Sequence, residues 1–142
     1  MIGVPTYGYE YDVTAYAGSD YLYDILWSFN PGYALPLAQQ YGITPQRNGT
    51  GEMYFTYVPA ATSSAPVSLG PNSAPLAALA AVAYADTYNS HLDFRMLVWP
   101  DAHSLQTKID LAKKLGVRGV SIFKLDGGQD PNIWATLAGV KK

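Results

Sequence analysis

Residues 98–134, VWPDAHSLQTKIDLAKKLGVRGVSIFKLDGGQDPNIW, hold the most regular pattern in the chain. Asp101 or Ser104 can cap a helix over residues 104–115, and Gly116 can end it. Its apolar stripe is Leu105, Ile109, Ala112 and Leu115, and Asp110 and Lys114 are spaced as an i,i+4 ion pair. This stretch therefore predicts an amphipathic helix that packs against other elements through one face.

The helix is followed by a predicted strand and a second helix. Residues 117–125, VRGVSIFKL, are mostly apolar, which is typical of a strand buried on both faces in a parallel sheet. Asp130-Pro131 then begins a last helix carrying Ile133, Trp134 and Leu137. The order strand, helix, strand, helix indicates a βα unit at the end of the chain.

A second strand is expected at the beginning, at about residues 2–7. Pro5 removes a hydrogen-bond donor and two glycines weaken the stretch, so this strand should be short. A strand, a long excursion, and then a helix and a strand predict two neighbouring parallel strands of one α/β sheet with an elaborated crossover.

The excursion begins with an ambiguous stretch and a helix. Residues 19–29 fit both a helix and a buried extended segment, and the sequence leaves the two open. Asn30-Pro31 and Gly42 bracket a helix. Because an interior proline costs about 3 kcal/mol, Pro36 predicts that this helix begins nearer Tyr33 or Leu35.

The rest of the excursion predicts a hairpin, a loop, a helix and a strand. Asn48-Gly49 is a turn dipeptide before an alternating strand, and the turn also explains the glycosylation pattern at residues 48–50. Residues 59–75 have the composition of a surface loop. Pro75 opens an alanine-rich helix to about Asn89 with a Leu76, Leu79, Ala83 stripe, and residues 94–99 form a strand.

Composition argues for one globular domain and against several classes of partner. The 142 residues are 49% hydrophobic and 14% charged with a net charge of −2, so no basic field favours nucleic acid or anionic lipid. No apolar run is long enough for membrane insertion, and the first residues lack the features of a signal peptide. With no cysteine, and with only His91 and His103 as histidines, we expect no metal site and no cofactor.

Residues 3–12, GVPTYGYEYD, together with residues 98–134 resemble the C-terminal part of a family 18 glycoside hydrolase, closest to the branch of spore peptidoglycan hydrolases. The resemblance implies an α/β fold, a partial (β/α)8 TIM barrel made of its last two strand–helix units with an α+β insertion between them. Residues 1–18 would be the seventh-strand unit, 19–92 the insertion, and 93–142 the seventh helix, eighth strand and eighth helix.

The resemblance also implies a catalytic chemistry, and this chain lacks the acidic motif that carries it out in the family. The family cleaves bonds next to N-acetylglucosamine with a glutamic acid that ends a D-x-x-D-x-D-x-E motif, and the eleven carboxylates here never have that spacing. We therefore assign no catalytic residue and expect the chain to be inactive alone. The implied partners are an oligosaccharide or polysaccharide substrate and the N-terminal part of the barrel. The implied location is extracellular or in the cell envelope.

Ligands of a β/α barrel lie at the carboxyl ends of its strands. The substrate-binding candidates are therefore Tyr7, Tyr9, Glu10, Tyr11, Phe123, Lys124 and Asp126. Phe123 stands where the family usually has a tryptophan under the bound sugar, so weaker or altered sugar binding is expected, with a core role as the alternative.

Other readings of these candidates remain open. Tyr7 and Tyr9 either bind sugar hydroxyls or pack inside the barrel. Glu10 is more simply a solvated loop carboxylate, and Lys124 and Asp126 either pair with each other or contact the ligand. The three tryptophans, at 27, 99 and 134, are most simply core. The alternative function is a non-catalytic saccharide-binding or structural module.

Overall fold

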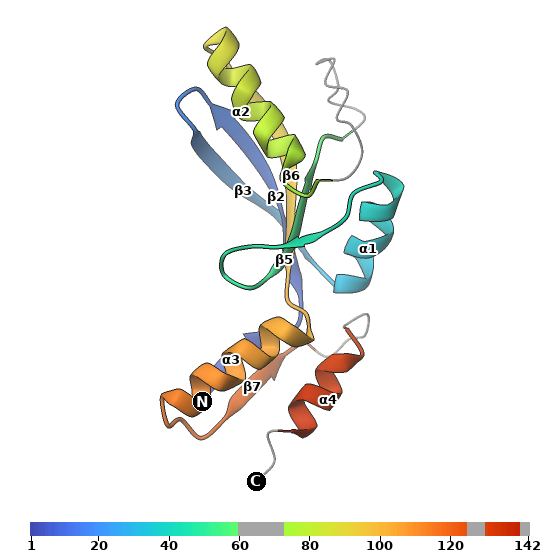
Figure 1. The fold of residues 1–142 in the computed structure, drawn as a ribbon, viewed down its shortest axis with the longest axis vertical. Helices are drawn as coiled ribbons and strands as arrows, with labels where there is room; N and C mark the ends of the chain where they lie inside the picture. Colours follow the sequence, from blue (N-terminus) through green and yellow to red (C-terminus); the bar gives the residue numbers. More distant parts are fainter. Residues whose placement is uncertain (60–72, 125–129, 140–142) are drawn as a thin grey trace.

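The computed structural model describes residues 1–59, 73–124 and 130–139. Its elements form two groups, which lie in the lower and upper halves of Figure 1. The lower group contains two strands, β1 (Ile2–Pro5) and β7 (Val120–Phe123), and two helices, α3 (Ala102–Lys114) and α4 (Asn132–Ala138). The upper group is a sheet with two further helices. The fold is thus mixed α/β.

The expected parallel pair is confirmed in the lower group. β1 and β7 run parallel with Ile2 opposite Val120 and Pro5 opposite Phe123. The side chains of Val4, Leu105, Ile109 and Ile133 form a buried cluster between the strands and the two helices. The prediction that the second strand is buried on both faces was wrong for this chain: Phe123, at the end of β7, is 55% exposed.

The upper group is built on a five-stranded antiparallel sheet with the order β3-β2-β6-β5-β4. Its strands are β2 (Gly8–Tyr16), β3 (Asp20–Phe29), β4 (Gln46–Arg47), β5 (Met53–Tyr57) and β6 (His91–Trp99). The hairpin at Asn48-Gly49 and the strand at residues 94–99 are confirmed.

The ambiguous stretch at residues 19–29 is strand β3. It was expected as a helix or a buried extended segment, but all its residues except Phe29 are exposed. The reason is its place in the sheet: β3 is an edge strand that pairs with β2 on one side only. Leu26 forms a bulge there, since Glu10 pairs with Trp27 while the next residue, Tyr11, pairs with Ile25.

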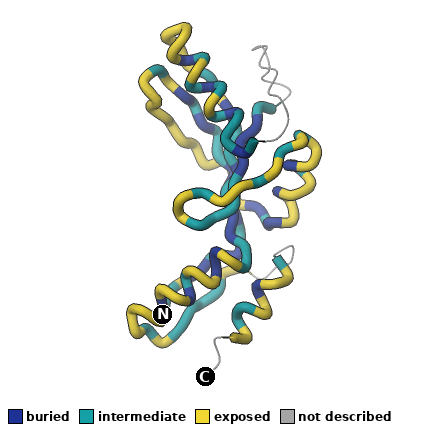
Figure 2. Tube along the Cα trace, viewed as in Figure 1, coloured by how far each residue is buried: buried dark blue, intermediate teal, exposed yellow. Residues whose placement is uncertain are grey.

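Two helices cover opposite faces of this sheet at opposite ends, and each buries its own set of strand residues. Figure 2 shows the buried segments running through the middle of the sheet. The helix α1 (Pro31–Gln40) packs its alanines on the half of the sheet near β1, against Phe29, Phe55 and Leu97. The helix α2 (Leu76–Tyr88) packs on the other face of the outer half, against Val13, Ala15 and Phe94. Accordingly, β2 buries Glu10 on the first face but Val13 and Ala15 on the second.

Two of the helical predictions were wrong in detail. The helix α1 begins at Pro31 and contains Pro36, because burial of Ala34 and Ala38 outweighs the one hydrogen bond that the proline removes. In α2 the buried stripe is Ala77, Ala81 and Ala85, and Leu79 is exposed. The small side chains let α2 lie close to the sheet, which a leucine stripe would prevent.

The helix α3 follows its prediction more closely. Asp101 is the N-cap within a capping box formed with Ser104, and three of the four expected stripe residues are buried. The fourth, Leu115, is exposed. Asp110 lies 4.0 Å from Lys113 rather than pairing with Lys114 as expected. Among the described residues, no helix is long and apolar enough to cross a membrane.

Candidate functional site

The carboxyl ends of β1 and β7 lie side by side because the two strands are parallel neighbours. Thr6 is buried where they meet, and its hydroxyl donates to the carbonyls of Phe123, at 2.8 Å, and Lys124. Lys124 has a φ of 68°, a left-handed conformation that is strained for a residue with a side chain. Its ammonium lies 5.7 Å from the centre of the Tyr7 ring. The predicted candidates Tyr7 and Lys124 are thus brought together.

Phe123 lies on the face of this strand pair that points away from the two helices. Ile2, Val4 and Val120 belong to the helix-side cluster, so by alternation Gly3 and Phe123 lie on the opposite face. A Cβ atom added at Gly3 would be 2.7 Å from Cε2 of Phe123, so the ring lies directly over this glycine. With 55% exposure, the ring is not buried by the described residues of this chain.

A row of tyrosines begins at the strand ends and follows β2 outward. The rings of Tyr7 and Tyr9 meet edge to face with centroids 5.4 Å apart, and those of Tyr9 and Tyr11 lie 6.2 Å apart. The hydroxyl of Tyr9 donates to that of Tyr7 over 3.5 Å, which raises the pKa of Tyr9. All three side chains are partly exposed, so the structure brings three predicted residues into one half-open aromatic surface.

Glu10 does not belong to this surface, and its interpretation as a solvated loop carboxylate was wrong. It lies within β2, is 4% exposed and faces the α1 side of the sheet. Its carboxylate accepts hydrogen bonds from Tyr57 Oη at 2.7 Å, Trp27 Nε1 at 2.8 Å and Tyr33 Oη at 3.3 Å. A buried carboxylate needs such donors, and here three aromatic side chains supply them.

The hydrogen bonds to Glu10 also affect the pKa values of the two tyrosines that donate them. Burial and the adjacent carboxylate of Glu10 raise the pKa of Tyr57 far above its ordinary value, and they raise the pKa of Tyr33 in the same direction. Both phenols therefore stay protonated and remain donors. Glu10 is buried, and its carboxylate is held by these three donors.

The three tryptophans differ in burial, whereas all three were predicted to be core residues. Trp99 is buried, but Trp27 is 45% and Trp134 50% exposed, so the core interpretation was wrong for these two. Trp27 lies on the exposed edge strand and is held by Glu10 and by the Tyr33 ring, whose centroid is 4.8 Å away. Trp134 lies on α4, where its neighbour Ile133 takes the buried position.

A polar clamp joins the upper sheet to the lower group. Arg47 on β4 donates to both carboxylate oxygens of Asp101, at 3.0 and 2.7 Å, and also to the carbonyl of Gly51. Ser104 donates to the same carbonyl, and Lys108 pairs with Glu52. The hairpin is thereby fixed to the first turns of α3.

Sequence reasoning missed the Glu10 network, the clamp and the role of Thr6. Each of these joins residues far apart in the chain, so no local pattern announces them. Asp126 lies outside the described residues. Within the part of the chain that the structure describes, no group of three or more His, Asp or Glu side chains is arranged to hold a metal ion.

Comparison with solved structures relates this architecture to known proteins. The spore cortex-lytic enzyme SleL of Bacillus megaterium aligns with 100% of this chain over 25% of its own length, with a TM-score of 0.59 and 22% identity. SleL of Bacillus cereus gives a TM-score of 0.62 at 19% identity, again over 100% and 25%. The chain shares their fold. The resemblance predicted from the sequence is confirmed at that level.

A chitinase from Chromobacterium violaceum gives a similar result, with a TM-score of 0.55, 18% identity and coverage of 97% of this chain and 31% of that one. No protein-family model matches the sequence, and no curated protein matches it either. The chain spans a quarter to a third of the length of these structures. At these identities the likeness describes the fold.

Proposed function

We propose that this chain is the C-terminal part of a family 18 type glycoside hydrolase and supplies glycan-binding surface to that enzyme. Two observations support the proposal. The fold is shared with part of a cortex-lytic enzyme and part of a chitinase. The two sequence segments that resemble the family, residues 3–12 and 98–134, contain all of β7 and all of β1 except its first residue.

In this proposal the lower group is the end of a β/α barrel. β1 and β7 with α3 and α4 are its last two strand–helix units. The insertion between β1 and α3 then includes the whole antiparallel sheet, from β2 to β6, and is longer than the 19–92 expected from the sequence. A two-stranded parallel sheet leaves strand edges to be paired and one face to be covered. The exposed ring of Phe123 marks that face. The partner is therefore the rest of the barrel.

The observation that carries glycan binding is the row of Tyr7, Tyr9 and Tyr11, which starts where the two parallel strands end. In β/α barrels, ligands bind at that end. Aromatic rings stack on the apolar face of a sugar while their hydroxyls bond to its rim. Phe123, Lys124 and Asp126 complete the proposed site, whose ligand is a glycan containing N-acetylglucosamine, such as chitin or peptidoglycan.

The chemistry belongs to residues outside this chain in the proposal. None of its carboxylates has the spacing of the acidic motif, and Glu10 is buried by three aromatic donors. If the coding DNA upstream of Met1 is an open frame with that motif, the hydrolase interpretation is supported. A stop codon there favours the alternative, a non-catalytic saccharide-binding module. Either protein would work at the cell envelope or outside it, where such glycans occur.

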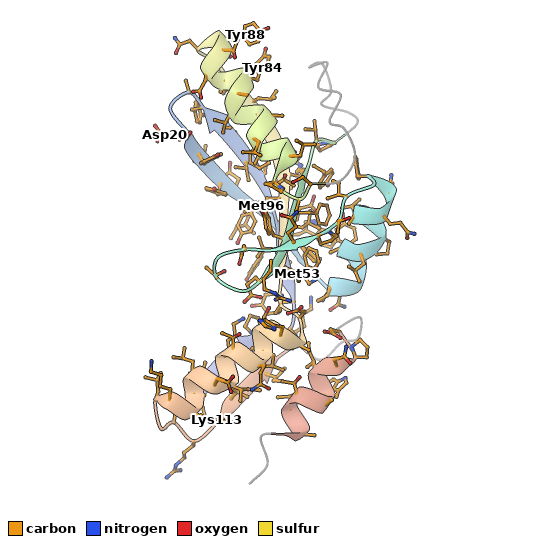
Figure 3. The ribbon with its side chains drawn as sticks, viewed as in Figure 1. Asp20, Met53, Tyr84, Tyr88, Met96 and Lys113 are labelled. Atoms are coloured by element: carbon orange, nitrogen blue, oxygen red, sulfur yellow. The ribbon has the colours of Figure 1, made fainter. Side chains whose placement is uncertain are left out.

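Titration calorimetry with N-acetylglucosamine oligosaccharides tests the proposed binding directly. We expect the chain to bind them and the substitution Tyr7→Ala to weaken binding about three- to tenfold, the effect of losing one aromatic contact. Tyr88→Ala is the matched control, because Tyr88 is an exposed tyrosine on α2, far from the strand ends, as its label in Figure 3 shows. Equal affinities of the two variants would contradict the proposed site.

A further inference from the structure

The tyrosine row does not end on β2. In the register of the sheet, Tyr23 lies opposite Val13 and Tyr21 opposite Ala15, on the same face as Tyr11. The centroids of the Tyr11 and Tyr23 rings are 6.3 Å apart, and those of Tyr23 and Tyr21 are 6.0 Å apart. These distances match the 5.4 and 6.2 Å spacings between the first three rings. Five tyrosines therefore form one continuous row across two strands.

The outer part of this row is open to a ligand. The helix α2 packs on β6, β2 and β5 and covers Val13, Ala15 and Phe94, but the rings on β3 lie beside it. Tyr21 is 40% and Tyr23 49% exposed. The backbone N–H of Gly18 donates to Asp86 at 2.7 Å, which ties the turn between β2 and β3 to the helix. In Figure 3 this turn, beside Asp20, lies next to the outer half of α2, which bears Tyr84.

The row is also held rigidly. Tyr23 meets Tyr11 edge to face, and Tyr21 meets the buried Phe94 in the same way, at 6.4 Å. Both tyrosines are on the part of β3 that is paired without interruption with β2, from Asp20 to Ile25. Partial burial raises the pKa of Tyr23, so its hydroxyl stays protonated as a donor. Little conformational freedom is left to lose when a ligand settles on these rings.

From this geometry we infer that Tyr23 and Tyr21 extend the glycan-binding surface beyond Tyr11, so that the chain contacts an extended glycan rather than a short one. The inference rests on the proposed function. The ligand chemistry follows from the side chains: each ring offers an apolar face and one hydroxyl, which matches the apolar faces and hydroxyl rims repeated along a polysaccharide.

The inference is tested by the dependence of affinity on glycan length. Titration calorimetry compares a disaccharide and a hexasaccharide of N-acetylglucosamine with the unmodified chain and with Tyr23→Ala. We expect Tyr23→Ala to weaken hexasaccharide binding about three- to tenfold and to leave disaccharide binding unchanged. Tyr23→Phe, which keeps the ring, should lose less. Tyr16→Ala is the control, since Tyr16 is exposed on the neighbouring strand β2 but faces the other side of the sheet.

The outcomes separate this inference from the proposed function. If Tyr7→Ala weakens both oligosaccharides while Tyr23→Ala behaves like Tyr16→Ala, the glycan site stands and its extension over β3 is wrong. If the unmodified chain binds neither oligosaccharide, both are wrong. A loss of disaccharide affinity in Tyr23→Ala equal to its loss of hexasaccharide affinity would also overturn the inference, because the effect would then not depend on length.

Discussion

At the scale of single residues, Glu10 is the side chain whose environment most changes its interpretation. Its neighbours in sequence are tyrosines near a strand end, which made it a ligand candidate. In the fold it is a buried acceptor for three donors from three different elements. A buried charge is tolerated only when it is paired or hydrogen-bonded, so Glu10 and its aromatic donors depend on one another.

Replacing Glu10 should therefore destabilise the chain. Glu10→Gln replaces one acceptor oxygen by an amide donor, which leaves at least one of the three donors unsatisfied. We expect a loss of about 1–3 kcal/mol in the free energy of unfolding, measured by urea denaturation. Asp24→Asn, on the exposed strand β3, should change it by less than about 0.5 kcal/mol. Equal stabilities of the two variants would show that the network contributes nothing.

The fluorescence of Trp27 offers a second test of the hydrogen bonds to Glu10. Its indole N–H is held by Glu10, so Glu10→Gln should shift the fluorescence spectrum of a variant that keeps Trp27 as the sole tryptophan. Phe can replace Trp99 and Trp134 for this purpose. An unchanged spectrum would mean that the hydrogen bond does not persist in solution.

At the scale of elements, the clamp between the β4–β5 hairpin and α3 fixes how the upper sheet meets the lower strand pair. Asp101 has two tasks there, as N-cap of α3 and as partner of Arg47. Burial alone would raise the pKa of Asp101, but hydrogen bonds from Arg47 and Ser104 outweigh it and hold that pKa well below its ordinary value. The carboxylate is therefore favoured in the folded state.

The lowered pKa of Asp101 predicts how the free energy of unfolding changes with pH. Because the folded-state pKa of Asp101 is lowered, its contribution to stability is complete above about pH 4 and is lost as the pH falls below that value. Asp101→Asn keeps a capping acceptor but loses the charge, so its unfolding free energy should fall less steeply than that of the unmodified chain below about pH 4. The free energy of unfolding of both proteins is measured by urea denaturation at a series of pH values. If it falls equally steeply in both below about pH 4, the prediction is wrong.

A second substitution separates the contribution of Asp101 as helix cap from its contribution as the ion-pair partner of Arg47. Asp101→Ala removes both the cap and the ion pair and should cost about 1–2 kcal/mol at neutral pH. Asp101→Asn should cost less at that pH, because an asparagine at the N-cap is as favourable as an aspartate. If the two variants are equally stable at neutral pH, the cap contributes nothing.

At the scale of the whole molecule, exposed apolar side chains lie on strands that are paired on one side only. The edge strand β3 exposes Leu22, Ile25 and Leu26, and Phe123 is exposed on β7. An exposed edge without lysine or proline offers free backbone donors and acceptors to another strand. In the proposed enzyme, the rest of the barrel covers the strand pair, whereas β3 keeps its edge.

The purified chain should therefore self-associate at high concentration through β3. Leu22→Lys places a charge on that edge and should lower the associated fraction in sedimentation velocity runs. Leu79→Lys is the control, since Leu79 is similarly exposed but lies on α2. Should Leu79→Lys reduce association as much as Leu22→Lys does, the effect would be one of net charge and not of the strand edge.

The sequence by itself determined the elements whose signals are local. The helix α3 with a cap at Asp101 or Ser104, the turn at Asn48, the approximate ends of α2 and the pairing of two parallel strands all follow from neighbouring residues and connection order. Strand β2 shows where this fails: α1 covers one of its faces at one end and α2 the opposite face at the other, so no single alternation describes it.

Only the tertiary structure decided which tyrosines share a surface and what Glu10 does. The row from Tyr7 to Tyr21 crosses from β2 to β3 because the strand pairing places Tyr23 opposite Val13 and Tyr21 opposite Ala15. The bulge at Leu26, which no residue type announces, places Trp27 opposite Glu10. Glu10 meets Tyr57, which is 47 residues away, because β2 and β5 both pair with β6 in the same sheet. Such contacts form when distant segments pack, and a sequence pattern read along the chain carries local preferences only.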